Sequence, residues 1–137
     1  MTLYLDSSAL VKLYIDEPGS ADVAQLVHDA AVVATSSLAY PEIRAALARR
    51  RRERTITPRQ LNNARQQFDS DWATMFVLSF DTPMTHRAGV LAEDHALRGA
   101  DAVHLASFER LLAGAGDEDV RFSCADQRLS QAARRLG

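Results

Sequence analysis

Short apolar runs alternate along the chain with longer stretches in which apolar residues recur every three or four positions. The short runs are typical of buried strands. The longer periodic stretches are typical of helices that pack through one face. The pattern predicts strands at residues 2–5, 31–35, 76–80 and 120–124. It predicts helices at about 8–15, 20–29, 36–52, 57–73, 83–94, 99–113 and 126–136.

Helix signals support several of these boundaries. Ser36 or Ser37 is expected to cap the helix that follows the second strand, since a serine oxygen can accept from the free N–H groups of the first turn. Thr57 followed by Pro58 indicates another start, with threonine as N-cap and proline at the first helical position. The glycines of 114–116 should end the helix before the last strand.

Strands that alternate with helices favour an α/β fold, because helical crossovers connect parallel strands and cover both faces of the sheet. We expect a three-layer arrangement with a short parallel sheet of about four to five strands. With 137 residues and no obvious linker, the chain is predicted to form a single domain over 1–137.

Composition narrows the setting. Cys124 is the only cysteine, so no internal disulfide can form. The apolar runs are too short for a membrane span, and the first strand carries no signal-peptide pattern. We therefore expect a cytoplasmic protein with no membrane partner.

The distribution of charge is more informative than its sum. The formal net charge is −2, yet six arginines lie between residues 44 and 54. Arginine grips phosphate through its planar fork, which favours a nucleic-acid contact around Arg49. The same residues also suit a solvated helix end, where positive charge complements the helix dipole. Both interpretations can hold together.

Four acidic residues follow strands or head helices. Asp6 and Asp126 lie just after the first and fourth strands, and the carboxyl ends of parallel strands form sites in open α/β sheets. Glu42 borders the apolar stripe of its helix, and Asp101 heads the stripe of a later one. Carboxylates gathered in this way repel one another, so they predict a hard cation such as Mg²⁺ or Mn²⁺.

Each acid has a structural alternative, since Asp6 and Asp126 could be N-caps and Glu42 a first-turn partner of the helix dipole. Three further positions could assist the site. Ser8 can hold a carboxylate, Arg98 can pair with an acid or meet a phosphate, and His104 can touch substrate or simply be packed.

The motifs resemble those of a known family. They are LYLDSSALVKLY at 3–14, YPEIRAAL at 40–47, LRGADAVHLA at 97–106 and FSCADQRL at 122–129. In order and spacing they are similar to the PIN-domain ribonucleases, specifically the VapC toxins of bacterial toxin–antitoxin pairs. The first and third motifs are the specific ones, and no acidic position departs from the pattern.

The resemblance implies a metal-dependent endoribonuclease toxin that cuts RNA and so arrests translation. Asp6, Glu42, Asp101 and Asp126 would hold one or two Mg²⁺ or Mn²⁺ ions. Ser8 would orient a ligand, while Arg49, Arg98 and His104 would contact RNA. A VapB-like antitoxin would neutralise the protein, and a homodimer is expected.

Three other functions are compatible with an acidic site in an α/β fold. Phosphoacceptor signalling domains resemble one another in having a lysine after a late strand. The only lysine here is Lys12, in the first predicted helix. A phosphatase with a nucleophilic aspartate would carry a second aspartate two residues after the first, where this chain has Ser8. A PIN-like module that binds RNA or protein without cutting remains the main alternative.

Overall fold

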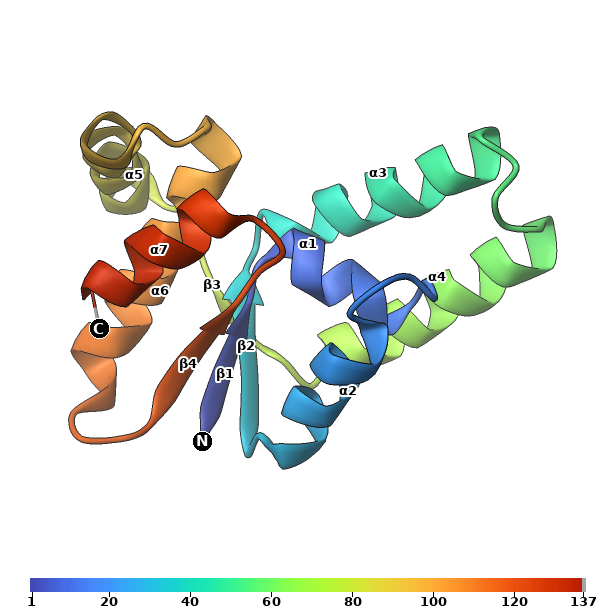
Figure 1. Ribbon diagram of the computed structural model, residues 1–137, viewed down its shortest axis with the longest axis horizontal. Helices are drawn as coiled ribbons and strands as arrows, with labels where there is room; N and C mark the ends of the chain where they lie inside the picture. Colours follow the sequence, from blue (N-terminus) through green and yellow to red (C-terminus); the bar gives the residue numbers. More distant parts are fainter. Residues whose placement is uncertain (137) are drawn as a thin grey trace.

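The sheet of this protein has four parallel strands in the order β3-β2-β1-β4 (Figure 1). The computed structural model describes residues 1–136. The strands are β1 (Thr2–Leu5), β2 (Val32–Ser36), β3 (Phe76–Leu78) and β4 (Val120–Ser123). In the central pairs, Leu3 lies beside Val33 and Leu5 beside Ser123. All the carboxyl ends therefore meet at one edge of the sheet.

Helices cover both faces of this sheet, which confirms the predicted three-layer α/β fold (Figure 1). On one face lie α1 (Ser7–Leu10), the 3-10 turn η1 (Val11–Leu13), α2 (Ser20–Asp29), α3 (Ala39–Arg52) and α4 (Pro58–Trp72). On the other face lie α5 (Thr82–His95), α6 (Gly99–Ala115) and α7 (Gln127–Leu136). That residues 1–137 form a single domain stays a prediction.

The alternation of side chains along β1 divides the core in two. Tyr4 points into the cluster formed with α5, α6 and α7, whereas Leu3 and Leu5 point into the cluster formed with α1 to α4. All three side chains have no exposed surface. The strand that carries the first acidic residue is thus held from both sides.

Most predicted helix signals are found where expected. Thr57 accepts from the backbone N–H of Gln60, whose side chain returns a bond to the backbone of Thr57, forming a complete capping box. Gly116 ends α6 with a φ of 62°. Among the helices of residues 1–136, none has the length and hydrophobicity needed to cross a bilayer.

Two local predictions were wrong. The segment 8–15 is not one helix, because α1 ends at Leu10 and continues as the tighter turn η1. Neither Ser36 nor Ser37 caps α3, whose N-cap is Leu38 without a side-chain bond. Ser36 accepts from the N–H of Leu38 and Ser37 from that of Phe80, so both hydroxyls hold the loop that leads into the helix.

Candidate active site

The fold carries the four predicted acids to the carboxyl edge of the sheet. Asp6 directly follows β1, and Asp126 lies in the segment between β4 and α7. Glu42 is in the first turn of α3 and Asp101 in the first turn of α6. Because β1 and β4 are parallel neighbours, Asp6 and the segment before Asp126 leave the sheet side by side.

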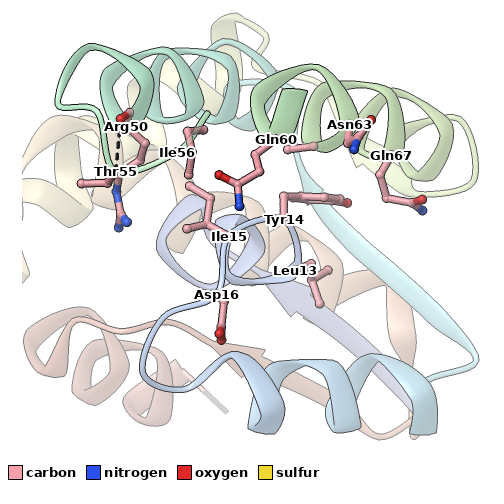
Figure 2. A pocket seen from close by; sticks show the side chains of 11 residues that line it. Leu13, Tyr14, Ile15, Asp16, Arg50, Thr55, Ile56, Gln60, Asn63 and Gln67 are labelled. Atoms are coloured by element: carbon pink, nitrogen blue, oxygen red, sulfur yellow. Dashed lines mark hydrogen bonds between the residues drawn. The ribbon is translucent and has the colours of Figure 1, made fainter. Parts of the chain in front are cut away.

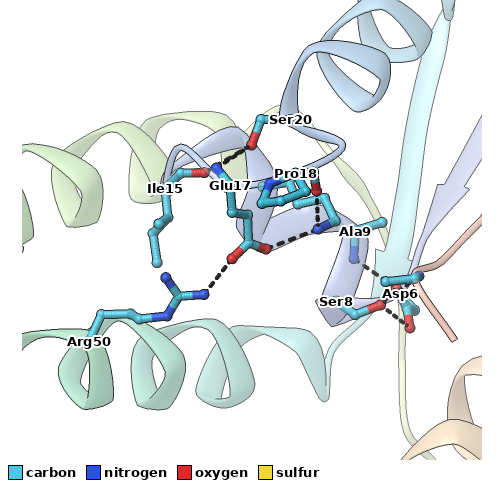
Figure 3. A network of polar contacts seen from close by, with 10 residues as sticks. Asp6, Ser8, Ala9, Ile15, Glu17, Pro18, Ser20 and Arg50 are labelled. Atoms are coloured by element: carbon cyan, nitrogen blue, oxygen red, sulfur yellow. Dashed lines mark hydrogen bonds and ion pairs between the residues drawn. The ribbon is translucent and has the colours of Figure 1, made fainter. Parts of the chain in front are cut away.

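Asp6 is the most deeply buried of these acids, with 3% of its surface exposed. Its carboxylate accepts from the backbone N–H of Ala9 at 2.9 Å, which makes it the N-cap of α1, and from the Ser8 hydroxyl at 2.8 Å (Figure 3). Burial raises the pKa of Asp6, and the nearby negative charge of Asp101 raises it further, against these hydrogen bonds. Burial therefore outweighs the groups that favour the ionised form of Asp6, which include the imidazole of His104.

Ser8 connects two parts of the site. Its hydroxyl donates to Asp6 and accepts from the backbone N–H of Ala125 at 2.9 Å. Ala125 immediately precedes Asp126, which in turn accepts from the N–H of Leu129 at 2.8 Å and caps α7. The cap interpretations of Asp6 and Asp126 are therefore both correct, and Ser8 joins the two caps.

Glu42 is held by two side chains from other elements. Its Oε1 accepts from the Ser7 hydroxyl at 2.6 Å and lies 2.9 Å from Nε2 of His104. Burial by itself raises the pKa of Glu42, but the bonds from His104 and Ser7 outweigh it, so the pKa is lowered. Glu42 is thus kept ionised in one orientation.

His104 extends this chain of contacts into the core. Its Nδ1 lies 2.8 Å from the hydroxyl of Tyr4, whose own pKa is raised by burial so that the O–H is kept. A carboxylate only accepts, so Nε2 carries the proton in the bond with Glu42, while Nδ1 is hydrogen-bonded to the hydroxyl of Tyr4. The resulting order, Tyr4 to His104 to Glu42, spans β1, α6 and α3.

This position corrects the expectation that His104 contacts RNA. The residue is 2% exposed and both ring nitrogens have protein partners. A side chain so enclosed has no free polar atom to offer a nucleic acid. The sequence had left open that His104 is packed, and the structure favours that alternative.

Asp101 and Asp126 complete the group. Asp101 pairs with Nε of Arg98 at 3.2 Å, and its carboxylate is 16% exposed beside the far more open arginine. Burial raises the pKa of the Cys124 thiol to about 12, assisted by the negative charges of Asp6, Asp126 and Asp101. All three aspartates therefore lie near Cys124, whose thiol is unsuited to be a nucleophile.

The donor chemistry of this group fits a hard divalent cation, since the donors are carboxylate oxygens and burial disfavours the charge of Asp6. The acids are, however, not a finished metal cage. Within residues 1–136, no three His, Cys, Asp or Glu side chains are grouped so that they could hold a metal ion as they stand. Each carboxylate is instead turned toward a local partner, such as Arg98 at Asp101.

Ser7 and Tyr4 were missed by sequence reasoning. Ser7 lies in the first motif beside Ser8, and only the helical turn of α1 sends the two hydroxyls to different acids. Tyr4 reads as one more buried strand residue, because its contact with His104 joins positions 100 residues apart. A polar atom on a buried strand residue next to a predicted acid is the available signal, since buried hydroxyls need partners.

The other two predicted RNA contacts, Arg98 and Arg49, are exposed. Arg98 is paired with Asp101 but has 83% of its side chain exposed, so a phosphate can reach it. Arg49, with 74% exposed, pairs with Glu53 one helical turn further along α3. Both guanidinium groups remain at the surface.

Comparison with known proteins places this arrangement in a family. The PIN domain model matches residues 3–132. Ribonuclease VapC45 of Mycobacterium tuberculosis (strain CDC 1551 / Oshkosh) is 38% identical over 135 residues, which cover 98% of this chain and 91% of the relative.

Two solved structures share the fold. The M. tuberculosis toxin VapC20, described as cleaving the sarcin–ricin loop, superposes with a TM-score of 0.70 at 18% identity, covering 95% of this chain and 94% of that one. VapBC2 from Rickettsia felis, bound to a DNA fragment from the promoter of the pair, gives a TM-score of 0.54 at 13% identity, covering 78% and 79%.

Proposed function

Because this chain belongs to the PIN-domain family, within its VapC group, we propose that it is a metal-dependent endoribonuclease toxin. The observation that carries the proposal is the burial of Asp6 beside Asp101 at the carboxyl edge of the sheet. A buried carboxylate next to a second one is costly unless a cation or a proton compensates the charge. The acids therefore supply both the ligands and the need for a divalent ion.

In this proposal, Asp6, Glu42, Asp101 and Asp126 hold one or two Mg²⁺ or Mn²⁺ ions. When bound, such an ion lowers the pKa of water and offsets the charge that develops on a phosphate during hydrolysis. The protein's own contribution is to orient its acids: Ser8 fixes Asp6, and Ser7 with His104 fixes Glu42. Mutation of residues that orient metal ligands in this way commonly lowers metal affinity or activity by about 10- to 100-fold.

Arg98 has a second use in this scheme. Its guanidinium balances Asp101 in the absence of other cations, and the long, exposed side chain can turn to a phosphate oxygen instead. Single-stranded or looped RNA is the proposed substrate, because its backbone and bases are accessible. Arg98 would then help to hold the scissile phosphate near Asp101.

We also propose a VapB-like antitoxin as the partner, supported by the VapBC2 pair among the structural neighbours. A homodimer stays a prediction. Exposed apolar side chains that could serve either contact include Phe76, Phe80 and Val90, with 55%, 44% and 47% of their surface exposed. Light scattering of the purified chain, alone and with its antitoxin, would determine both stoichiometries.

The decisive experiment is cleavage of total cellular RNA by purified protein with Mg²⁺ or Mn²⁺. Asp101→Asn keeps the size of the side chain but removes its charge, and should abolish cleavage while leaving the fold intact. Asp119→Asn is the matched control. Asp119 is also an aspartate paired with an arginine, Arg121, but it is exposed and precedes β4, at the end of the strand opposite to the acids. Full activity of Asp101→Asn would contradict the assignment of the site.

The alternative, a PIN-like module that binds without cutting, predicts a different outcome. Such a module would bind RNA or protein with and without metal, and Mn²⁺ would neither stabilise the fold nor produce fragments. Fragments from the wild type alone, lost when the metal is chelated, would exclude it.

A further inference from the structure

Positive charge is concentrated on one arm of the molecule. Helices α3 and α4 form an antiparallel pair that extends away from the sheet and is joined at its outer end by residues 53–57 (Figure 1). Eight arginines and one glutamate lie between residues 44 and 65, a formal charge of +7 in a chain whose total is −2. The rest of the chain carries a formal charge of −9, and this segment alone holds half of the 16 basic residues.

Some of these arginines already have partners. Arg44 donates to the hydroxyl of Tyr40 at 2.8 Å, and Arg49 to Glu53 at 2.7 Å. Arg50 pairs with Glu17, which also pairs with Lys12 at 3.1 Å and so fastens the arm to the loop after η1 (Figure 3). These contacts explain their positions without any external ligand.

The guanidinium of Arg50 also borders a pocket of about 610 Å³ between the arm and that loop. Figure 2 shows Ile15 and Tyr14 on one side of this pocket and Gln60 on the other. The lining of this pocket is mixed, and Arg50, its only basic residue, is already paired with Glu17.

Four arginines at that outer end are different. Within residues 1–136, the side chains of Arg51, Arg52, Arg54 and Arg59 make no hydrogen bond or ion pair, and we call them the tip arginines. Three of them, Arg52, Arg54 and Arg59, are exposed, and Arg51 is partly so. Arg51 and Arg52 lie in the last turn of α3, where the helix dipole favours positive charge, but four like charges placed this closely also repel one another.

The backbone at Arg54 adds an independent observation. Helix α3 ends in a Schellman motif, in which the N–H of Thr55 bonds to the carbonyl of Arg50 and that of Arg54 to the carbonyl of Arg51. The residue that adopts the left-handed conformation there is Arg54, with φ of 59°. Glycine is the usual residue at this position, because a side chain costs about 1–2 kcal/mol in that conformation.

Arg59 is also placed against a local preference. It lies in the first turn of α4, just after Pro58, where the helix dipole favours acidic residues over basic ones. Two of the tip arginines therefore occupy positions that disfavour arginine. A residue retained against the stability of the fold points to a ligand.

We propose that the tip arginines bind the sugar–phosphate backbone of the RNA substrate, away from the bond that is cut. This inference rests on the proposed endoribonuclease function. Arg54 is 12 residues beyond Glu42, which corresponds to about 18 Å along a helix. An RNA strand bound at the acids must therefore extend about 18 Å along α3 to reach the tip arginines.

The distance also separates contact from long-range electrostatics. At physiological ionic strength the Debye length is about 8 Å, so charges about 18 Å from the acids are largely screened from them. An effect of the tip arginines on RNA must therefore come from direct contact with the nucleic acid. Phosphate contacts carry no sequence information, so they should strengthen binding of any RNA long enough to reach the tip.

The test compares two variants that remove the same amount of charge. Arg52→Gln/Arg54→Gly removes two tip arginines, and Arg134→Gln/Arg135→Gln removes two exposed arginines of α7. Both are made in the Asp101→Asn chain, so that binding is measured without cleavage. The assay is fluorescence anisotropy with an unstructured RNA of about 20 nucleotides over a range of salt concentrations.

The tip variant should bind roughly 10- to 30-fold more weakly at 0.1 M salt, with the slope of log K against log salt smaller by about 1.4. The α7 variant should change neither value appreciably. The melting temperature of the tip variant should not fall, because glycine relieves the left-handed residue. A loss of binding accompanied by a loss of stability would contradict a direct contact.

Equal affinities in the two variants would overturn the proposal, whether both bind like the parent or both weaken together. In the first case the tip does not touch RNA, and in the second only net charge matters. Failure of the wild type to cleave RNA would instead contradict the proposed function, because the binding assay does not depend on cleavage. The two ideas can therefore fail separately.

Discussion

The buried contact between Tyr4 and His104 allows a sharp test of how the site is held. Tyr4→Phe deletes one hydroxyl and changes little else, since the ring stays between Phe122 and Phe108. The deletion leaves Nδ1 of His104 without its 2.8 Å partner in a place that water does not reach. An unsatisfied buried polar group costs about 1–3 kcal/mol, which for a domain of this size lowers the melting temperature by roughly 4–10 °C.

The same substitution should also affect catalysis. With Nδ1 unpaired, the imidazole is free to rotate and Glu42 loses the fixed direction of its bond from Nε2. We expect the rate at saturating RNA to fall by about 3- to 10-fold, less than for a residue that bonds an acid directly, and the Mn²⁺ concentration for half-maximal activity to rise. Urea denaturation and cleavage kinetics at several Mn²⁺ concentrations measure the two effects.

Tyr14→Phe is the matched control. The Tyr14 hydroxyl donates to Asp71 over the same 2.8 Å distance, but this pair joins η1 to α4 and makes no contact with Glu42. It should cost about 0.5–1.5 kcal/mol of stability and leave the Mn²⁺ dependence unchanged. If Tyr4→Phe and Tyr14→Phe respond to Mn²⁺ alike, Tyr4 is merely structural and the reasoning about Glu42 is refuted.

Three further predictions concern charge, backbone and metal. Burial raises the pKa of Glu17, but bonds from Lys12 and Arg50 outweigh it and lower the pKa, so its stabilisation is present above about pH 4.5 and lost as pH falls through the lowered value. Glu17→Gln should therefore destabilise the fold more at pH 7 than at pH 3, and an equal difference at both values in urea titrations would contradict the ion-pair argument. Ala96 ends α5 with φ of 52°, so Ala96→Gly should stabilise the protein by about 0.5–1 kcal/mol in the same assay, and destabilisation would argue against strain there. Mn²⁺ at about 100 times its Kd should add about 2.7 kcal/mol of stability to the wild type and clearly less to Asp101→Asn, and equal thermal shifts would exclude Asp101 as a ligand.

Local patterns in the sequence were sufficient for the architecture. The alternation of apolar strands and amphipathic helices identified the four strands and most helices, because burial of one face imposes its period on the chain. Asp6 and Asp126 could be assigned to the carboxyl edge of the sheet. Asp6 directly follows one predicted strand and Asp126 closely follows another, and parallel strands end at the same edge. Thr57 and Pro58 were readable because a capping box uses only neighbouring residues.

Contacts between distant residues were decided by the tertiary structure alone. Periodicity indicates which face of α6 is buried, but not that His104 on that face meets Tyr4 and Glu42, which lie 100 and 62 residues away in the chain. Likewise the sequence shows a run of arginines. Only the fold shows that Arg50 forms an ion pair with Glu17, while Arg52 and Arg54 have no partners among residues 1–136. The physical reason is that a side chain's partner depends on how helices and strands pack together, which no local pattern encodes.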